Sequence, residues 1–193
     1  MFGFKAKEKV SRIGLIGIQE LKVIKPDGSI RRQYQEYKPF AFLTKMHGIR
    51  LPRIPFLFGR MVDSVVFTNL ITNAGFAGAA ARLGSDATEV KFDYIAVGTG
   101  TTAAAAGNTT LETEITDSGL ARGTGTVSRV TTTQTNDTHQ VAKTFTVTGT
   151  KAVTEMGLLN ASSGGVLLGR NVFSAVNVVN GDSLVATYKV ACA

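Results

Sequence analysis

The second half of the chain alternates between short runs of apolar or β-branched residues and breaks rich in Gly and Asn. From residue 92 onward the runs have strand length, and they fall at 92–97, 111–115, 120–131, 141–149, 152–159, 166–173 and 183–191. Turn-forming residues separate them, for example Ser-Ser-Gly-Gly at 162–165 and Asn-Gly-Asp at 180–182. This spacing predicts a mainly β fold, an antiparallel β-sandwich or jelly-roll-like domain.

Two further elements are expected before residue 92. Residues 13–24 and 30–37 have strand-like patterns, and Lys-Pro-Asp-Gly at 25–28 provides the turn of a β-hairpin between them. Residues 69–83 predict one short helix, because Thr68 or Asn69 can cap its start, alanine fills it and Gly84 can end it.

Charge divides the chain into two parts. Residues 1–60 carry 13 Lys or Arg and 4 Asp or Glu, whereas the remainder carries 8 and 10, within an overall charge of +7. We therefore expect a basic, extended N-terminal arm with its hairpin at 1–60, and a β-sandwich domain with the helix at 61–193. A basic arm favours docking to an acidic protein surface or to nucleic acid, although its lysines could equally serve only solubility.

Residues 38–60 combine large apolar groups with five basic residues and three of the four prolines. Proline disfavours both helices and central strands, so this segment is expected to lie as an extended strap across another surface rather than as a loop on its own domain. Its candidate interface residues are Phe40, Phe42, Arg50, Arg53, Ile54, Phe56, Phe58 and Arg60.

Residue types that carry chemistry are sparse. His47 and His139 lie among residues that do not bind metals, and the single cysteine, Cys192, has no neighbouring base. The strand-like residues 92–97 precede Gly-Thr-Gly-Thr-Thr-Ala at 98–103, which matches a dinucleotide-binding fingerprint with Asp117 downstream. Gly107 interrupts the helix that this fingerprint requires, so a tight loop is the better interpretation. We expect no enzyme, catalytic residue, cofactor or metal.

Three carboxylates merit attention. Glu112 and Glu114 are two residues apart, which on a strand places them on one face; they could form a carboxylate pair, but an exposed face or an arginine site is the better interpretation. Glu155 lies in an otherwise apolar strand and needs a partner if it is buried. Arg170 or Arg122 could provide a structural ion pair.

The order of motifs resembles that of tailed-bacteriophage virion structural proteins. The resemblance covers about residues 66–191 and rests on residues 67–75, the Gly-Thr-Gly-Thr-Thr loop, Leu-Glu-Thr-Glu at 111–114, Thr-Glu-Met-Gly-Leu-Leu-Asn at 154–160 and Gly-Asp-Ser-Leu at 181–184. Members of this group are tail, neck or fibre-base components or decorate the capsid. The resemblance therefore implies a particle component without implying its position in the particle.

We accordingly expect a non-enzymatic structural protein of a phage virion, made in the host cytoplasm, that assembles through its arm with other virion proteins and with copies of itself. Incidental contact with nucleic acid is compatible with the basic arm. No apolar run is long enough to span a membrane, and no secretory signal is expected. The alternative is a receptor- or carbohydrate-binding β module, which the absence of tryptophan disfavours.

Overall fold

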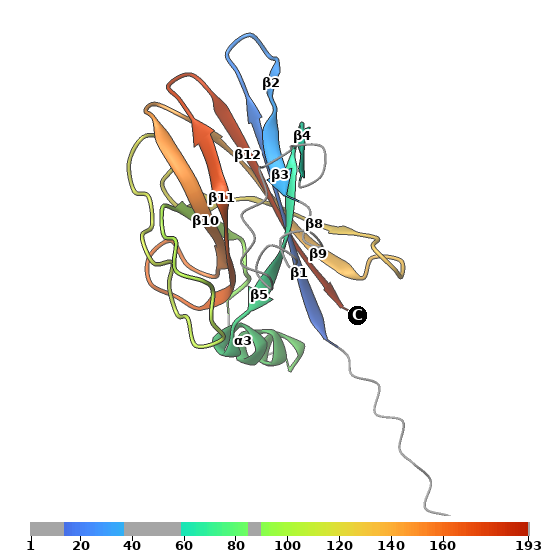
Figure 1. The fold of residues 1–193 in the computed structure, drawn as a ribbon. Helices are drawn as coiled ribbons and strands as arrows, with labels where there is room; N and C mark the ends of the chain where they lie inside the picture. Colours follow the sequence, from blue (N-terminus) through green and yellow to red (C-terminus); the bar gives the residue numbers. More distant parts are fainter. Residues whose placement is uncertain (1–13, 37–58, 85–89, 193) are drawn as a thin grey trace, which may run out of the picture.

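The computed structural model describes residues 14–36, 59–84 and 90–192. These residues form a mainly antiparallel β fold with one short helix (Figure 1), which confirms the expected fold class. The elements are β1 (Leu15–Ile24), β2 (Ile30–Arg31), β3 (Gln33–Glu36), β4 (Gly59–Val62), β5 (Val65–Ile71), α3 (Asn73–Leu83), β6 (Tyr94–Gly98), β7 (Gly123–Thr124), β8 (Thr126–Val130), β9 (Thr138–Thr146), β10 (Lys151–Leu159), β11 (Leu167–Val178) and β12 (Ser183–Cys192).

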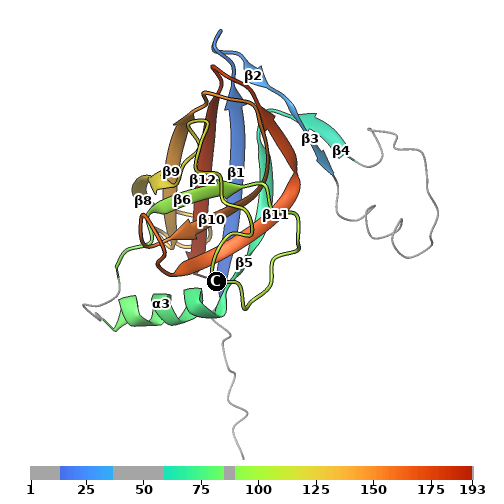
Figure 2. The same cartoon turned by 90° about the vertical axis from the view of Figure 1, so that its left-hand side faces the viewer.

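One sheet of ten strands makes up most of the fold. Its order is β7-β6-β10-β11-β5-β1-β12-β9-β8, and β2 pairs with β1 beside this path. The two end strands, β7 and β8, are separated in sequence only by Gly125, whose N–H donates to the Asp93 carbonyl at 2.8 Å. The sheet therefore rolls until its ends nearly meet, and its two halves face each other (Figure 2).

The core lies inside this roll. Strands β1 and β12 run antiparallel over their whole length, and buried positions alternate with less buried ones along most of each strand. Leu21 and Val23 of β1 therefore face inward beside Ala186 and Leu184 of β12. Residues of the opposite half meet them there. The strand period of two thus separates an apolar inner face from a more polar outer face.

The expected division at residue 60 does not describe this fold. Strand β1 belongs to the supposed arm, yet it lies between β5 and β12 in the sheet and pairs with both. The positive charge that suggested an arm comes from residues outside β1, because β1 carries only one acidic and one basic side chain, Glu20 and Lys22, at its outward-facing positions. The inward-facing positions of β1 belong to the core, and residues on both sides of position 60 build one sheet.

The expected hairpin forms only in part. The turn at 25–28 is present, but β2 pairs with β1 over only two residues, Ile30 and Arg31. The chain then leaves the main sheet, and β3 pairs with β4 as a separate two-stranded sheet. Arg31 connects this short hairpin to the turn between β11 and β12. Its Nη2 lies 3.0 Å from both carboxylate oxygens of the buried Asp182 in that turn.

The helix begins later than expected. Residues up to Ile71 belong to β5, and two of them, Leu70 and Ile71, pair with β11. Thr72 is the N-cap instead, because its hydroxyl accepts a hydrogen bond from the Gly75 N–H at 2.9 Å. Gly84 ends the helix as expected. Thr68 and Asn69 therefore lie in strand β5, and the capping role predicted for one of them belongs to Thr72.

Most later strands lie close to their expected ranges, with two exceptions. Residues 111–115 form only an isolated bridge, between Glu114 and Gly98. Residues 120–131 are divided into β7 and β8.

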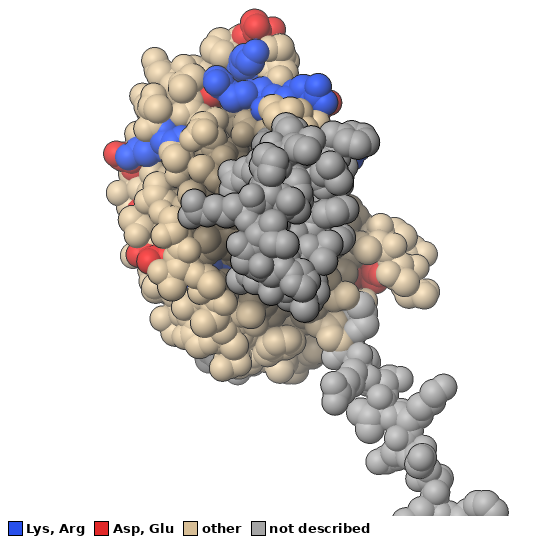
Figure 3. Space-filling view, viewed as in Figure 1, with Lys and Arg blue, Asp and Glu red and all other residues tan. Residues whose placement is uncertain are grey.

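On the face shown in Figure 3, Lys and Arg side chains gather at the end of the molecule that carries the β1–β2 turn.

Candidate functional site

A long loop, residues 99–113, covers the outer face of β10 and β11. Its two ends are held together, because the Thr99 N–H donates to the Thr113 carbonyl and the Ile115 N–H donates to the Val97 carbonyl, both at 2.9 Å. Leu111 anchors the loop in a small outer cluster with Ala96, Leu159 and Leu167, which packs apart from the main core. The loop is thus closed at its neck, as an Ω-loop is, and attached to the sheet by an apolar side chain.

Glu155 of β10 lies beneath this loop and is fully buried. A bulge in the β10–β11 pairing, between Val153 and Glu155, turns its side chain to the outer face. Oε1 accepts from the N–H groups of Gly100 at 3.1 Å and Thr113 at 2.7 Å. Oε2 accepts from the Glu112 N–H at 3.1 Å and from Arg170 Nε at 2.7 Å.

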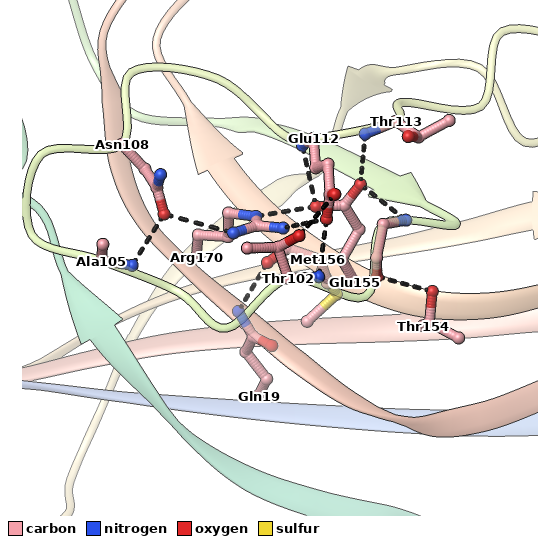
Figure 4. A network of polar contacts seen from close by, with 11 residues as sticks. Gln19, Thr102, Ala105, Asn108, Glu112, Thr113, Thr154, Glu155, Met156 and Arg170 are labelled. Carbon is pink, nitrogen blue, oxygen red and sulfur yellow. Dashed lines mark hydrogen bonds and ion pairs between the residues drawn. The ribbon is translucent and has the colours of Figure 1, made fainter.

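We call this arrangement the Glu155 clamp: the Glu155 carboxylate, Arg170, and the backbone N–H groups of Gly100, Glu112 and Thr113 (Figure 4). Each oxygen of an ionised carboxylate has about two acceptor positions, so the four bonds occupy all of them. The carboxylate joins both ends of the loop to the sheet. Arg170 was one of the two partners expected for Glu155, and the structure confirms it.

Arg170 extends the clamp to the middle of the loop. Its side chain is 2 % exposed, and its Nη1 donates to Asn108 Oδ1 at 3.2 Å while Nη2 donates to Glu112 Oε2 at 3.3 Å. Asn108 Oδ1 also accepts from the Ala105 N–H at 2.8 Å. The guanidinium therefore has a partner for each of its three nitrogens, which compensates its burial.

The loop glycines make room for this carboxylate. A Cβ on Gly98 would lie 2.4 Å from Glu155 Oε1, and one on Gly100 would lie 2.6 Å from the same atom. No helix follows these glycines in residues 99–111, as the sequence indicated, and a dinucleotide-binding geometry would require one. The close approach of backbone and carboxylate accounts for both glycines.

A second ion pair supports the chain that follows the loop. Arg122 Nε donates to Glu114 Oε1 at 2.9 Å, and its Nη1 donates to the carbonyls of Ala161 and Gly164 at 3.2 and 2.9 Å. Glu112 and Glu114 thus contact different arginines. They do not form a carboxylate pair, and the interpretation as arginine sites is confirmed.

The Glu155 clamp attaches the loop at residues 99–113 to the sheet. A general acid or base needs a lone pair or proton directed at a substrate, and every acceptor position of Glu155 is directed at a protein N–H. The side chain of Glu112 reaches solvent and is 37 % exposed. Its oxygens accept from Thr102, through the hydroxyl at 2.6 Å and the backbone N–H at 2.7 Å.

These contacts lower the pKa of Glu112, chiefly through the Thr102 side chain and backbone, with a smaller contribution from the charge of Arg170. A carboxyl group whose pKa is lowered by folding stabilises the protein above its unfolded pKa. It loses that contribution as the pH falls through the folded pKa.

We therefore predict that Glu112→Gln melts below the wild type at pH 7 and that the difference shrinks as the pH falls below about 4. Thermal melts at pH 7, 5 and 3 measure it. In a Thr102→Val background the pH dependence should weaken, because the main cause of the lowered pKa is removed. A difference in melting temperature that stays constant over this pH range would contradict the prediction.

The residues predicted as an interface mostly lie outside the described part of the chain. Only Arg60 is described, as an exposed residue of β4. His47 also lies outside it, whereas His139 contacts the Phe92 carbonyl through Nε2 at 2.9 Å. Cys192 is exposed, and Asp117 pairs with Lys151. Among the described residues, no three His, Cys, Asp or Glu side chains are grouped as metal ligands would be.

Sequence reasoning missed Thr102 and Asn108, which hold Glu112 and Arg170. Their polar side chains in a Gly- and Thr-rich stretch resemble those of any loop. The only available signal was the buried charge at Glu155, which required several donors from somewhere in the chain. A sequence does not show which backbone N–H groups are near it.

Three motifs of the resemblance to virion proteins meet at the Glu155 clamp. Glu155 comes from residues 154–160, Gly100 from the Gly-Thr-Gly-Thr-Thr loop, and Glu112 and Thr113 from residues 111–114. A fourth motif, at 181–184, contributes the buried Asp182 that pairs with Arg31. The motifs are therefore connected by the fold and not only by their order.

Comparisons with protein-family models, with curated proteins and with solved structures find no match to this chain. Among the residues that the structure describes, no helix is long and apolar enough to cross a membrane.

Proposed function

We propose that this chain is a non-enzymatic structural component of a bacteriophage virion: a tail, neck or fibre-base component or a capsid-decorating protein. It is made in the host cytoplasm and functions in the particle, where its partners are other virion proteins and copies of itself. The proposal rests on the resemblance of the motifs and on the use to which the fold puts them.

The observation that carries the proposal is that every hydrogen-bond acceptor position of the Glu155 carboxylate is used by a donor of the protein itself. Motifs that are far apart in the sequence converge on one buried carboxylate, and all of its acceptor positions are used to attach a surface loop. Shared motifs that serve an enzyme would place free polar groups at a substrate. These motifs instead hold a loop rigidly against the β-sheet, and a subunit needs such rigidity to keep its shape in an assembly.

The anchor of this subunit is proposed to be the segment between β3 and β4. Residues 37–58 contain seven of the eight predicted interface residues, and they are connected to the fold through the two-stranded sheet rather than through the core strands. Apolar side chains would provide most of the contact energy, at about 25 cal/mol per Å² buried. The arginines would set orientation against acidic neighbours.

The register of β3 and β4 allows a clean deletion. Glu36 and Gly59 lie opposite each other, so Asn-Gly in place of residues 37–58 would close a two-residue hairpin. We predict that this variant folds with the wild-type melting temperature but is depleted at least tenfold from particles. The measurement is quantitative mass spectrometry of density-purified particles from cells that express tagged wild-type or variant protein.

A matched variant separates surface chemistry from chain length. It keeps the full length and replaces Phe40, Phe42, Ile54, Phe56 and Phe58 by serine, and it should be depleted to a similar extent. Normal copy number of the deletion variant would show that the anchor lies elsewhere in the β body. Absence of the wild-type protein from purified particles, despite its abundance in the lysate, would overturn the virion proposal itself.

A further inference from the structure

The turn between β11 and β12 contains the only Asn-Gly pair in the sequence, Asn180-Gly181. Both residues are exposed, whereas the next residue, Asp182, is buried. Gly181 has a φ of 89°, and the Asp182 N–H donates to the Val179 carbonyl at 3.1 Å. This geometry is that of a type II turn, in which glycine at the third position avoids backbone strain.

An exposed Asn-Gly pair can lose ammonia in water. The glycine nitrogen attacks the asparagine Cγ, and the absence of a glycine side chain leaves this approach open. A bond forms between Gly181 N and Asn180 Cγ, the Cγ–Nδ2 bond breaks, and Nδ2 leaves as ammonia while Gly181 N loses its proton. Water then opens the cyclic succinimide. The product is aspartate or isoaspartate, which places a new negative charge in the turn.

The fold holds the nitrogen that would attack. The Gly181 N–H donates to the Val147 carbonyl at 2.9 Å, and the Val147 N–H donates back to the Asp182 carbonyl at 2.9 Å. Val147 directly follows β9, and its side chain belongs to the main core. The attack therefore requires a local opening that separates the turn from Val147.

Asp182 fixes the turn from its buried side. Its Oδ2 accepts from the Val179 N–H at 2.8 Å, and both of its carboxylate oxygens accept from Arg31 Nη2 at 3.0 Å. The Asp182 side chain is fully buried, and that of Arg31 is 32 % exposed. Hydrogen bonds between charged groups are stronger than those between neutral groups. Arg31 therefore holds, through Asp182, the turn that contains Asn180.

We propose that Asn180 is a site of spontaneous deamidation, and that Arg31 slows the reaction by keeping the turn closed. While the turn is closed, the Gly181 N–H remains bonded to Val147 and Asn180 keeps its amide. Without Arg31, the buried Asp182 carboxylate loses its ion-pair partner. The turn then opens more often, and Asn180 reacts from the open state.

The test follows deamidation of the folded full chain at mildly alkaline pH. Peptide mapping by mass spectrometry separates asparagine, aspartate and isoaspartate at position 180, and a synthetic peptide of residues 174–187 represents the open turn. We expect the wild type to react about tenfold or more slowly than the peptide, because only the open turn reacts. Arg31→Met should react several times faster than the wild type.

Two control variants separate the turn from its surroundings. Arg32→Met removes the neighbouring arginine, whose ion pair with Asp63 is exposed on both sides, and should react at the wild-type rate. Glu155→Gln weakens the fold at the Glu155 clamp without removing any contact of this turn, and it should also react at the wild-type rate. Equal acceleration in Glu155→Gln and Arg31→Met would mean that general stability protects Asn180, which would overturn the role of Arg31.

Two further results bear on the proposal without any variant. Equal rates in the wild type and the peptide, or no reaction at position 180 in the peptide, would overturn it. Hydrogen exchange of the Gly181 amide, measured by NMR on the wild type, gives an independent answer. Slow exchange supports the closed turn, and exchange as fast as in the peptide contradicts it.

Discussion

Glu155→Gln is expected to lower the free energy of unfolding by about 3–5 kcal/mol, the range found when one partner of a buried ion pair is removed. The substitution keeps the shape of the side chain but replaces one oxygen by an NH₂ group. Both oxygens of Glu155 accept two N–H donors each. Whichever way the amide turns, its NH₂ therefore faces two donors.

The consequence should be confined at first to the loop. The N–H groups of Gly100, Glu112 and Thr113 lose a charged acceptor, and Arg170 remains buried with weaker partners. We expect faster hydrogen exchange at these three amides and cleavage by proteases within residues 99–113. Denaturation in urea measures the stability, and exchange mass spectrometry locates the effect.

Two variants make this prediction specific. Lys151→Met removes an ion pair with the largely exposed Asp117 and should change stability little, because solvent screens such pairs. Arg170→Met should cost less than Glu155→Gln, since Glu155 would keep its three backbone donors. An Arg170→Met variant that is as unstable as Glu155→Gln would show that the ion pair, and not attachment of the loop, dominates.

The strands could be read from the sequence because each depends on a local pattern. Runs of apolar and β-branched residues located β9, β10 and β12, and Asn180-Gly181 located the turn between β11 and β12, two strands that do not pair with each other in the sheet. The place of β1 could not be read in this way. Gly17 and Gln19 occupy inward positions where an apolar residue would have indicated a core strand, and pairing with β12 joins the two ends of the chain.

The site was predictable in its centre and not in its surroundings. A carboxylate in an apolar strand demands a partner, and this rule identified Glu155 and Arg170 correctly.

The predicted start of the helix was wrong because Thr72, Thr68 and Asn69 can all act as N-caps. Tertiary pairing of Leu70 with β11 decided among them, and that pairing has no local signature.

Gly98→Ala is expected to destabilise the protein by about 3 kcal/mol, the upper part of the usual range for overpacking a tight site. Its Cβ would lie 2.4 Å from Glu155 Oε1 and 2.5 Å from the Thr113 carbonyl oxygen. Neither atom can retreat freely. The carboxylate is held by four donors, and the carbonyl accepts from the Thr99 N–H at the neck of the loop.

Gly107→Ala, in the loop that follows Gly98, is the matched control. A Cβ there meets no atom within 4 Å, and the residue is not among the described glycines with positive φ. The added methyl group restricts the unfolded chain and should leave stability unchanged or raise it by up to about 1 kcal/mol. Urea denaturation of the two variants beside the wild type measures the contrast. Equal stabilities would mean that the backbone does not press on Glu155. The Glu155 clamp would then lose its geometric basis. The same close approach that excludes a methyl group at Gly98 also brings the Gly100 N–H within reach of the carboxylate.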